Sequence, residues 1–357
     1  FDIRGRPQGG AWLIVITPRD FTSHPLPDLR DISAAVDVYL GLVRRGNPRE
    51  RDAAHRLFTM LLAPVFGEST EPIASLVVVP DGVLAGLPFA ALLPKADGPP
   101  LVDGTSISLA PSAATWLEQQ TLTEVETGTG CLGIADPELD GGATDHAPLP
   151  HARAEVRHAC RLVGGGSRVV AGAAATEAAV NQMLQNPFEV VHFATHAEVD
   201  NADPARTAIL LGGEDSIQDG RLSIAEVSNL RLDEPIVVLS ACRSAVGVIL
   251  QGEGVLGLTR AFFEGGARTV VGNLWPVDDR DASIHINRFD RHLVDGSSVS
   301  DALAGAQREL WADGEPTRVW AGLVVLGDGD HSLTPGWRAP MRWPGMFMSA
   351  AGVILLI

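Results

Sequence analysis

Two short segments of the sequence each end in a side chain that can take part in nucleophilic catalysis. The segment VVHFATHA carries His196 just beyond an apolar run, and the segment IVVLSACR carries Cys242 in the same way. A cysteine attacks an amide carbonyl as a thiolate, and a neighbouring imidazole promotes the thiolate and later protonates the leaving amine. The oxyanion formed in this attack needs backbone N–H donors, for which we expect the amides of Cys242 and Ala197 to serve.

Both side chains should lie on one rim of a sheet, because the carboxyl ends of parallel strands meet at the same edge. Taken alone, a buried cysteine is most often a small core residue, and a histidine beside a strand is most often a core residue with satisfied hydrogen bonds. His192 lies within its strand and fits that structural interpretation. For His196 and Cys242, the spacing of 46 residues and the matched positions after two strands favour catalysis.

Apolar runs rich in Val, Ile and Leu alternate with amphipathic stretches along most of the chain. We expect helices at residues 29–44, 49–66, 152–162, 176–184 and 253–264. We expect strands at residues 11–16, 76–80, 131–135, 168–171, 190–193, 209–211, 236–239 and 269–271. Fully apolar strands separated by helices are typical of a parallel sheet covered on both faces. The predicted fold class is α/β, with a mainly parallel central sheet flanked by helices.

The run GEGVLG at residues 252–257 matches the dinucleotide-binding pattern G-x-G-x-x-G, and Asp278 follows 21 residues later. That pattern holds a pyrophosphate only where the glycines follow a strand directly, but the segment that carries Cys242 intervenes here. Glu253 would also set a carboxylate against the pyrophosphate, whereas it suits the positive N-terminus of the helix that follows. We therefore expect no nucleotide and no other organic cofactor.

Charge and cysteine content argue against several classes of protein. The chain has 357 residues and a net charge of -17, and phosphate binding needs clustered Lys and Arg, so we expect no nucleic-acid partner. The three cysteines include no CxxC pair, which argues against a disulfide framework and against a metal site. We interpret Cys131 and Cys160 as core-packing residues and expect a cytoplasmic location. No signal peptide opens the sequence, and a start at Phe1 suggests a piece of a longer protein.

A series of small motifs occurs along the chain in a fixed order. At these residues the sequence resembles the CHAT peptidases, a caspase-like family related to separase and often attached to TPR repeats. The resemblance extends from about residue 28 to residue 328. The motifs are VPDG (79–82), LPFA (87–90), APS (110–112), HFATH (192–196), LSAC (239–242), GEGVLGLTRAF (252–262), GGAR (265–268), NLWPVDD (273–279), AL (302–303) with AQ (306–307), and WAGLVVLGD (320–328).

The resemblance implies a caspase-like α/β sandwich in which His196 is the base and Cys242 the nucleophile. By this resemblance the chain is a cysteine endopeptidase that hydrolyses peptide bonds of protein substrates through a thioester acyl-enzyme. The family serves in regulated proteolysis, including bacterial immunity. A TPR or other sensor domain in a longer parent chain is the expected partner.

Two departures from the family leave a second interpretation open. The residue after the histidine is usually Gly, and the methyl of Ala197 would crowd the oxyanion site if that position needs a positive φ. After the cysteine the family often has an acidic residue and Thr-Gly, where this chain has Arg243, Ser244 and Ala245. A pseudoprotease, which binds a peptide in its cleft without cutting it, is therefore the alternative function.

The resemblance and the element pattern divide the chain into three parts. Residues 1–119 are interpreted as the N-terminal supporting half of the CHAT unit, and residues 120–328 as the caspase-like catalytic half. Residues 329–357 form a tail that ends in 13 uncharged residues after Arg342 and Trp343. That stretch is too short to span a bilayer as given. We interpret it as a truncated transmembrane helix that would anchor the protein, with a tail packed on the domain as the alternative.

The segment WPVDD at residues 275–279 follows a predicted strand and should lie on the same rim as the catalytic pair. It resembles the separase stretch that helps line the pocket for the residue before the cut, and separase cleaves after Arg. A carboxylate in that pocket favours a cationic side chain, so Asp279 is our first candidate for substrate binding and Asp278 the second. The alternative is that one of them caps the helix that starts there.

Overall fold

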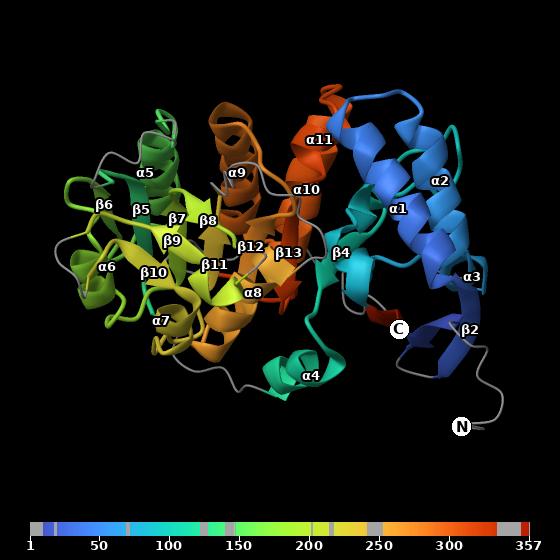
Figure 1. Cartoon of the computed structure of the whole chain (residues 1–357), viewed down its shortest axis with the longest axis horizontal. Helices are drawn as coiled ribbons and strands as arrows, with labels where there is room; N and C mark the ends of the chain where they lie inside the picture. The colour runs from blue at the N-terminus through green and yellow to red at the C-terminus, as the bar shows by residue number, and fades with distance from the viewer. Residues whose placement is uncertain are drawn as a thin grey trace.

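The structure is a computed structural model, and it describes residues 10–17, 20–68, 72–121, 128–139, 146, 148–200, 203–213, 218–240, 253–333 and 351–356. Within these residues an eleven-stranded sheet runs through the whole molecule, with helices packed against both of its faces (Figure 1). In sheet order its strands are β2 (Phe21–Asp28), β1 (Gly10–Ile16), β14 (Ala351–Leu356), β3 (Ser75–Val79), β4 (Ser106–Leu109), β13 (Leu323–Gly327), β12 (Thr269–Asn273), β11 (Ile236–Leu239), β7 (Val190–Ala194), β5 (Cys131–Pro137) and β6 (Arg168–Gly172).

The sheet consists of two parallel blocks and an antiparallel hairpin at one edge. Strands β12, β11, β7, β5 and β6 form one parallel block and β13, β4, β3 and β14 the other, while β12 and β13 pair antiparallel where the blocks meet. The hairpin of β1 and β2 is antiparallel, and β1 pairs antiparallel with β14. The predicted mainly parallel α/β sheet is confirmed. The predicted strand at 209–211 instead belongs to a small antiparallel sheet of β8 (Ala197–Glu198), β9 (Ala208–Leu210) and β10 (Arg221–Ser223).

Each of the five predicted helix ranges contains helical structure, and further helices occur where none was predicted. They are α1 (Leu29–Arg44), α2 (Glu50–Leu61), α3 (Ala63–Glu68), α4 (Ala113–Thr121), α5 (Ala152–Val163), α6 (Glu177–Met183), α7 (Ile224–Ser228), α8 (Glu253–Glu264), α9 (Asp279–Val294), α10 (Val299–Ala312) and α11 (Thr317–Trp320), with 3₁₀ turns η2 (Gly82–Gly86), η3 (Phe89–Ala91), η4 (Leu101–Asp103) and η5 (Pro204–Arg206). The single helix predicted at 49–66 is two helices, because Pro64 has no N–H to donate and its ring clashes with the preceding turn.

Strands β7, β11 and β12 are buried on both faces, as their mainly apolar sequences predicted. On β7, Val191 and Phe193 pack with Leu258 and Phe262 of α8 in one cluster. Val190, on the opposite face, belongs to a second cluster that contains side chains of α9 and α10. Helices on the two sides of the sheet thus fix the strand positions, and with them the strand ends where chemistry was expected.

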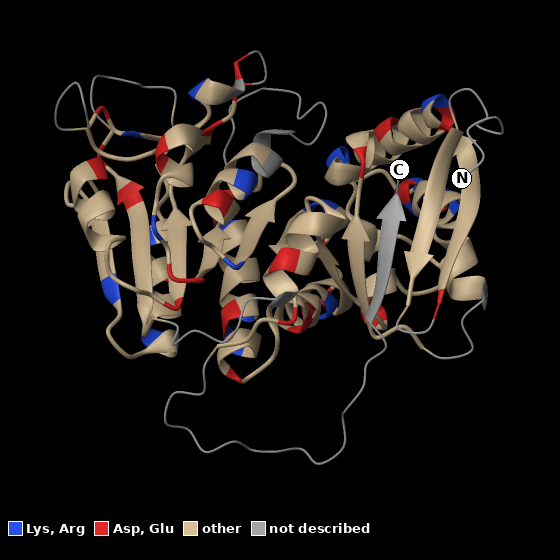
Figure 2. Cartoon of the chain, turned by 90° about the horizontal axis from the view of Figure 1, so that it is seen from below, with Lys and Arg blue, Asp and Glu red and all other residues tan. Residues whose placement is uncertain are grey.

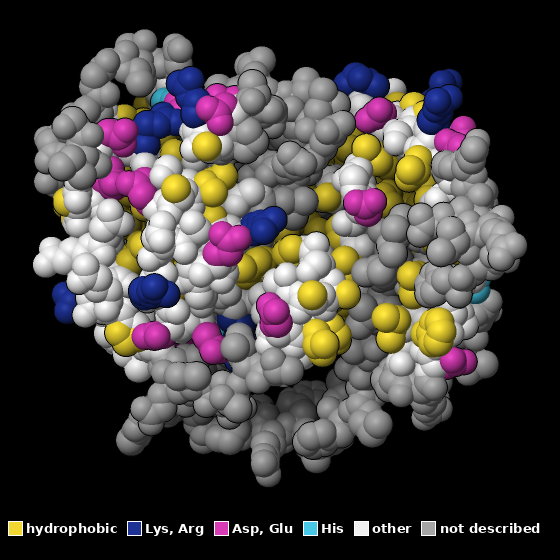
Figure 3. Space-filling model, turned by 60° about the horizontal axis from the view of Figure 1, so that its bottom comes forward, with side chains coloured by type: hydrophobic (Ala, Val, Ile, Leu, Met, Phe, Trp, Pro, Cys, Tyr) yellow, Lys and Arg dark blue, Asp and Glu magenta, His cyan; other side chains and the backbone are white. Residues whose placement is uncertain are grey.

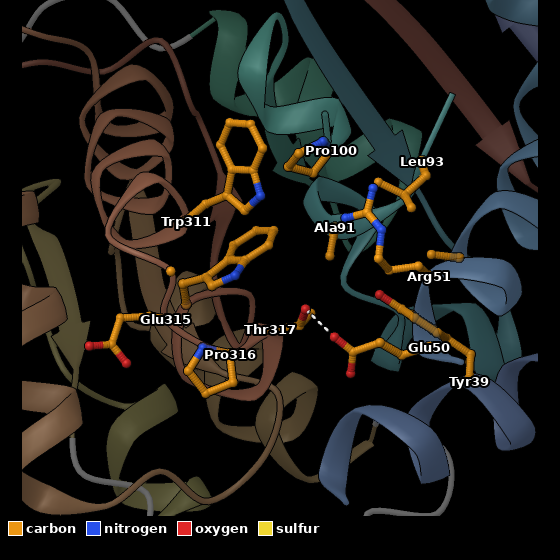
Figure 4. Close-up of a pocket in the computed structure, with 13 residues that line it drawn as sticks. Tyr39, Glu50, Arg51, Ala91, Leu93, Pro100, Trp311, Glu315, Pro316 and Thr317 are labelled. Carbon is orange, nitrogen blue, oxygen red and sulfur yellow. Dashed lines mark hydrogen bonds between the residues drawn. The ribbon is translucent and has the colours of Figure 1, made fainter. Parts of the chain in front are cut away.

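A third and larger cluster joins the two halves of the chain. Tyr39 and Leu57 of the N-terminal helices pack in the same cluster as Trp275 and Trp320. Next to it a cavity of about 240 Å³ lies between α1 and α2 on one side and the segment from Trp311 to α11 on the other (Figure 4). There the Thr317 hydroxyl donates a hydrogen bond of 2.6 Å to Oε1 of Glu50. The two halves therefore share one core.

Charged residues lie mainly on helices and loops (Figure 2). On the face in Figure 3, Lys and Arg side chains are interspersed with acidic and apolar ones. This distribution accords with the net charge of -17. Phe21, the first residue of β2, is 71% exposed and pairs with Ile16 of β1.

The C-terminal segment differs from the prediction. Residues 351–356 form the strand β14, which pairs antiparallel with β1 and parallel with β3, and not the membrane helix that we expected from the apolar run. Val353 and Ile354 are β-branched and favour a strand, and the slot between β1 and β3 supplies their backbone hydrogen bonds. In the part of the chain that the structure describes, no helix has the length and apolar character needed to cross a membrane.

The expected lack of disulfides is also wrong. Cys131 at the start of β5 and Cys160 on α5 are bonded to each other, with Cα atoms 4.9 Å apart. Both are buried, at 0% and 4% exposure, so each does pack in the core as expected. Cysteine spacing could not reveal the bond, because the packing of α5 on β5 brings the two residues together across 29 positions of sequence.

The disulfide should contribute measurably to stability. Closing a loop of this length in the unfolded chain is expected to stabilise the folded state by about 3 kcal/mol. A reductant should therefore lower the midpoint of thermal unfolding of the natural protein. The same reductant should leave the midpoint of a Cys131→Ala variant unchanged. Equal melting of the natural protein with and without reductant would contradict this expectation.

Candidate active site

The two strands that lead to the predicted catalytic residues lie side by side. Strands β7 and β11 are parallel, with Phe193 opposite Leu239. The register continues one residue further, because the backbone N–H of Ser240 donates to the Phe193 carbonyl at 3.1 Å. Both strands therefore end on the same rim of the sheet, as the sequence predicted. His196 follows β7 on this rim and is 5% exposed.

Cys242 lies outside the described residues, together with Arg243, Ser244 and Ala245. The last described residue before it is Ser240, and the chain is described again from Glu253, the first residue of α8. Strand β11 ends at Leu239, so the glycine run at 252–257 does not follow its strand directly. This separation agrees with the reason for rejecting a dinucleotide site.

Ala197 is accommodated without backbone strain. Among the described residues other than glycine, only Asp136 and Glu234 have a positive φ, so Ala197 does not occupy the conformation that would require glycine. Its methyl is 4% exposed and packs in the cluster under α8. Leu210 of β9 braces the segment, donating its N–H to the His196 carbonyl at 2.8 Å.

The ring of His196 stacks on a second histidine that the sequence analysis missed. The centroids of the His146 and His196 rings are 4.9 Å apart, and the angle between the ring planes is 30°. Nε2 of His146 lies 3.3 Å from Oε1 of Glu198, and Nη1 of Arg221 lies 2.5 Å from the other oxygen of Glu198. Burial raises the pKa of Glu198, but Arg221 and then His146 outweigh it, so the net pKa is lowered. No periodicity or motif marks His146 in the sequence.

Behind the rim, a buried carboxylate links three elements. Oε1 of Glu155, on α5, lies 2.9 Å from Nε2 of His192 on β7 and also accepts a hydrogen bond from the hydroxyl of Ser240. Asn273 at the end of β12 donates to the Ser240 carbonyl at 3.1 Å. His192 is fully buried in this network, in agreement with its structural interpretation. The network fixes Ser240, two positions before Cys242.

Asp290 of α9 adds a second buried carboxyl near this network. Burial, with a smaller contribution from Glu155 and opposed by His192, raises its pKa to about 7. Between the ordinary value of 3.8 and about 7, the folded protein keeps a proton that the unfolded chain has lost. The carboxyl therefore makes the free energy of unfolding decrease as pH rises through this window.

Asp290→Asn should remove that pH dependence. Urea unfolding at pH 5 and pH 8 should show a smaller loss of stability with rising pH in the variant than in the natural protein. Asp295→Asn, at an exposed position after the same helix, is the matched control and should behave like the natural protein. Identical pH profiles for Asp290→Asn and the natural protein would contradict the assignment.

The two aspartates of the WPVDD segment occupy different positions. Asp278 is exposed and stands at the N-cap position of α9, but its side chain makes no capping hydrogen bond. Asp279 is half-buried, and its Oδ2 accepts the backbone N–H of His151 at 2.8 Å, at the start of α5. Burial raises the pKa of Asp279 and outweighs this hydrogen bond. Trp275 is buried and donates to the Arg318 carbonyl at 2.9 Å.

The described residues include no group of three His, Cys, Asp or Glu side chains that could hold a metal ion. The cavity in Figure 4 is lined by residues of α1, α2, α10, α11 and η3 and of the loops beside them, and none of these residues lies at the ends of β7 or β11.

The ordered motifs and the rim geometry have a counterpart in known proteins. The model of the CHAT domain matches residues 51–328. The chain belongs to the CHAT domain family. The solved structure of the Arg-specific cysteine proteinase gingipain R is similar over 85% of this chain and 75% of that one, with a TM-score of 0.51 and 11% identity. The fold is thus the caspase-like α/β sandwich that the resemblance implied.

Other similar proteins are much longer than this CHAT domain. Tetratricopeptide repeat protein 28 of Mus musculus is 26% identical over 83% of this chain, and its Homo sapiens counterpart is 25% identical over the same share. In both cases this chain covers only 14% of the relative. Separase in its Saccharomyces cerevisiae complex with securin has a TM-score of 0.42 and 16% identity, covering 69% of this chain and 15% of that one.

Proposed function

We propose that this CHAT domain is a cysteine endopeptidase in which Cys242 is the nucleophile and His196 the base. The observation that carries the proposal is the pairing of β7 with β11, continued by the hydrogen bond from Ser240 to Phe193. Two parallel neighbouring strands lead into the segments with these side chains, and this is the arrangement in which a base and a nucleophile can meet.

The proposed reaction proceeds in two halves. His196 takes the thiol proton of Cys242, the sulfur forms a bond to the scissile carbonyl carbon, the C–N bond breaks, and His196 gives that proton to the leaving amine. Water then attacks the thioester carbonyl carbon while His196 accepts a proton from it. The C–S bond breaks, the new carboxyl group is released, and His196 returns the proton to the Cys242 sulfur. Backbone N–H groups of Cys242 and Ala197 are the proposed donors to the oxyanion in both halves.

Cys242→Ala and His196→Ala should each abolish peptide cleavage, because each removes a group that changes bonding in the reaction. The rate should fall by at least about a thousandfold in each variant. His196 lies beyond the last residue of β7, so the midpoint of thermal unfolding of His196→Ala should shift little. Cleavage is measured on a library of fluorogenic peptides, and full activity of Cys242→Ala would contradict the proposal.

The alternative is a pseudoprotease that binds peptides without cutting them. Its sequence support was Ala197, but the absence of a positive φ there means that the methyl causes no backbone strain. A peptide carrying a thiol-reactive group separates the two functions. Covalent labelling of Cys242 in the natural protein, lost in His196→Ala, supports the peptidase. Reversible binding without labelling or cleavage supports the pseudoprotease.

We further propose that the enzyme prefers a basic residue before the cut. Two carboxylates, Asp279 and Asp278, follow β12, whose last residue Asn273 is hydrogen-bonded to Ser240. A carboxylate near the bound peptide attracts a cationic side chain and disfavours an acidic one. Because Asp279 also holds the start of α5 through His151, its substitution must keep a hydrogen-bond acceptor.

Matched peptides with Arg, Leu or Asp before the scissile bond test this preference. The Arg peptide should be cleaved fastest, and Asp279→Asn should reduce that advantage by about tenfold through loss of the charge. Asp278→Asn should have a smaller effect. Equal or faster cleavage of the Leu or Asp peptide by the natural protein would refute the preference, as would an Asp279→Asn variant that cuts the Arg peptide at the natural rate.

The relatives suggest the setting in which this domain acts. Two of them carry the name tetratricopeptide repeat protein 28, and this chain matches about one seventh of their length. We propose that TPR repeats, in the same chain or in a partner, control access of protein substrates to the rim. Copurification of this domain with such repeats, and a change in its peptidase rate on their addition, would test the proposal.

A further inference from the structure

His146 covers one face of the proposed catalytic base. Its ring is stacked on that of His196, with 4.9 Å between the ring centroids and 30° between the ring planes. Its side chain is only 10% exposed. The contact is remote in sequence, because 50 residues separate the two histidines. A ring that lies flat against another restricts the rotation of its neighbour and shields it from water.

A chain of polar contacts holds His146 in this place. Its Nε2 lies 3.3 Å from Glu198 of β8. Nη1 of Arg221, on β10, donates a hydrogen bond of 2.5 Å to Oε2 of Glu198. Nη2 of Arg221 donates a second hydrogen bond of 3.0 Å to the carbonyl of Arg206. The small antiparallel sheet therefore carries both ends of the contact, since His196 directly precedes β8.

These polar contacts suit a base that must change its charge during the reaction. Glu198 accepts from Nε2 of His146, so that nitrogen carries a proton in the stacked arrangement. The negatively charged Glu198 is separated from the base by the ring of His146, and a nearby negative charge favours a positive one. This charge favours the protonated form of His196 that must give its proton to the leaving amine. The titratable or charged side chains with a contact to His146 that carries this argument are His196 and Glu198, and Arg221 acts through Glu198.

We propose that His146, held by Glu198 and Arg221, is a positioning residue that orients His196 and stabilises its protonated form during catalysis. The proposal rests on the peptidase function proposed above. It assigns His146 no bond to the substrate and no proton transfer of its own. The small sheet of β8, β9 and β10 thereby gains a role in the reaction, as the support of the base.

The test compares three substitutions in the full chain. His146→Ala should lower kcat roughly tenfold and leave KM within about twofold, because the substrate is not touched and only the base is loosened. His146→Phe restores a flat ring and should recover most of kcat. Glu198→Gln keeps an acceptor for His146 but removes the negative charge, so the alkaline limb of its pH–rate profile should move to lower pH.

The control is His55→Ala, whose ring contacts the Leu93 carbonyl in the N-terminal half and whose loss should leave kcat unchanged. A natural kcat in His146→Ala, or a His146→Phe variant as slow as His146→Ala, would overturn the proposal. If the natural protein cleaves peptides while these variants do not differ, only this inference fails. If the natural protein neither cleaves peptides nor reacts with a thiol-reactive peptide at Cys242, the proposed function fails with it.

Discussion

The rim of this CHAT domain depends on one buried carboxylate. Glu155 is 2% exposed and joins α5 to β7 through His192 and to the end of β11 through Ser240. A carboxylate in the core is costly unless its partners satisfy it, so the three elements are held in one arrangement. Together with the pairing of β7 and β11, that arrangement sets where the two strands end relative to each other, and the proposed catalytic pair rests on it.

Much of the fold could be predicted because strands that are buried on both faces have mainly apolar sequences. The run at 236–239 is wholly apolar and the run at 190–193 is apolar apart from His192, and they form the adjacent strands β11 and β7. The same signal fails for short or polar strands. β2 contains two prolines and a largely exposed face, and it was not expected at all.

Three of the errors share a physical cause, since each concerned a contact between segments far apart in the chain. Cys131 and Cys160 meet because a helix packs on a strand, and His146 meets His196 because a loop residue reaches the rim. Neither contact follows from local propensity or periodicity. The apolar run at 351–356 is compatible with a helix or a strand. Its pairing with β1 and β3, which lie far from it in sequence, makes it a strand.

The position of β14 also governs how the protein can be made. In the described sheet, β14 lies between β1 and β3 and connects the β1–β2 hairpin to the rest. Its partner β1 is synthesised more than three hundred residues earlier. Until β14 is synthesised, the edges of β1 and β3 that pair with it stay uncovered in the nascent chain. Such edges readily pair with other chains. Chaperones that shield them during translation would be expected to raise the yield of folded protein.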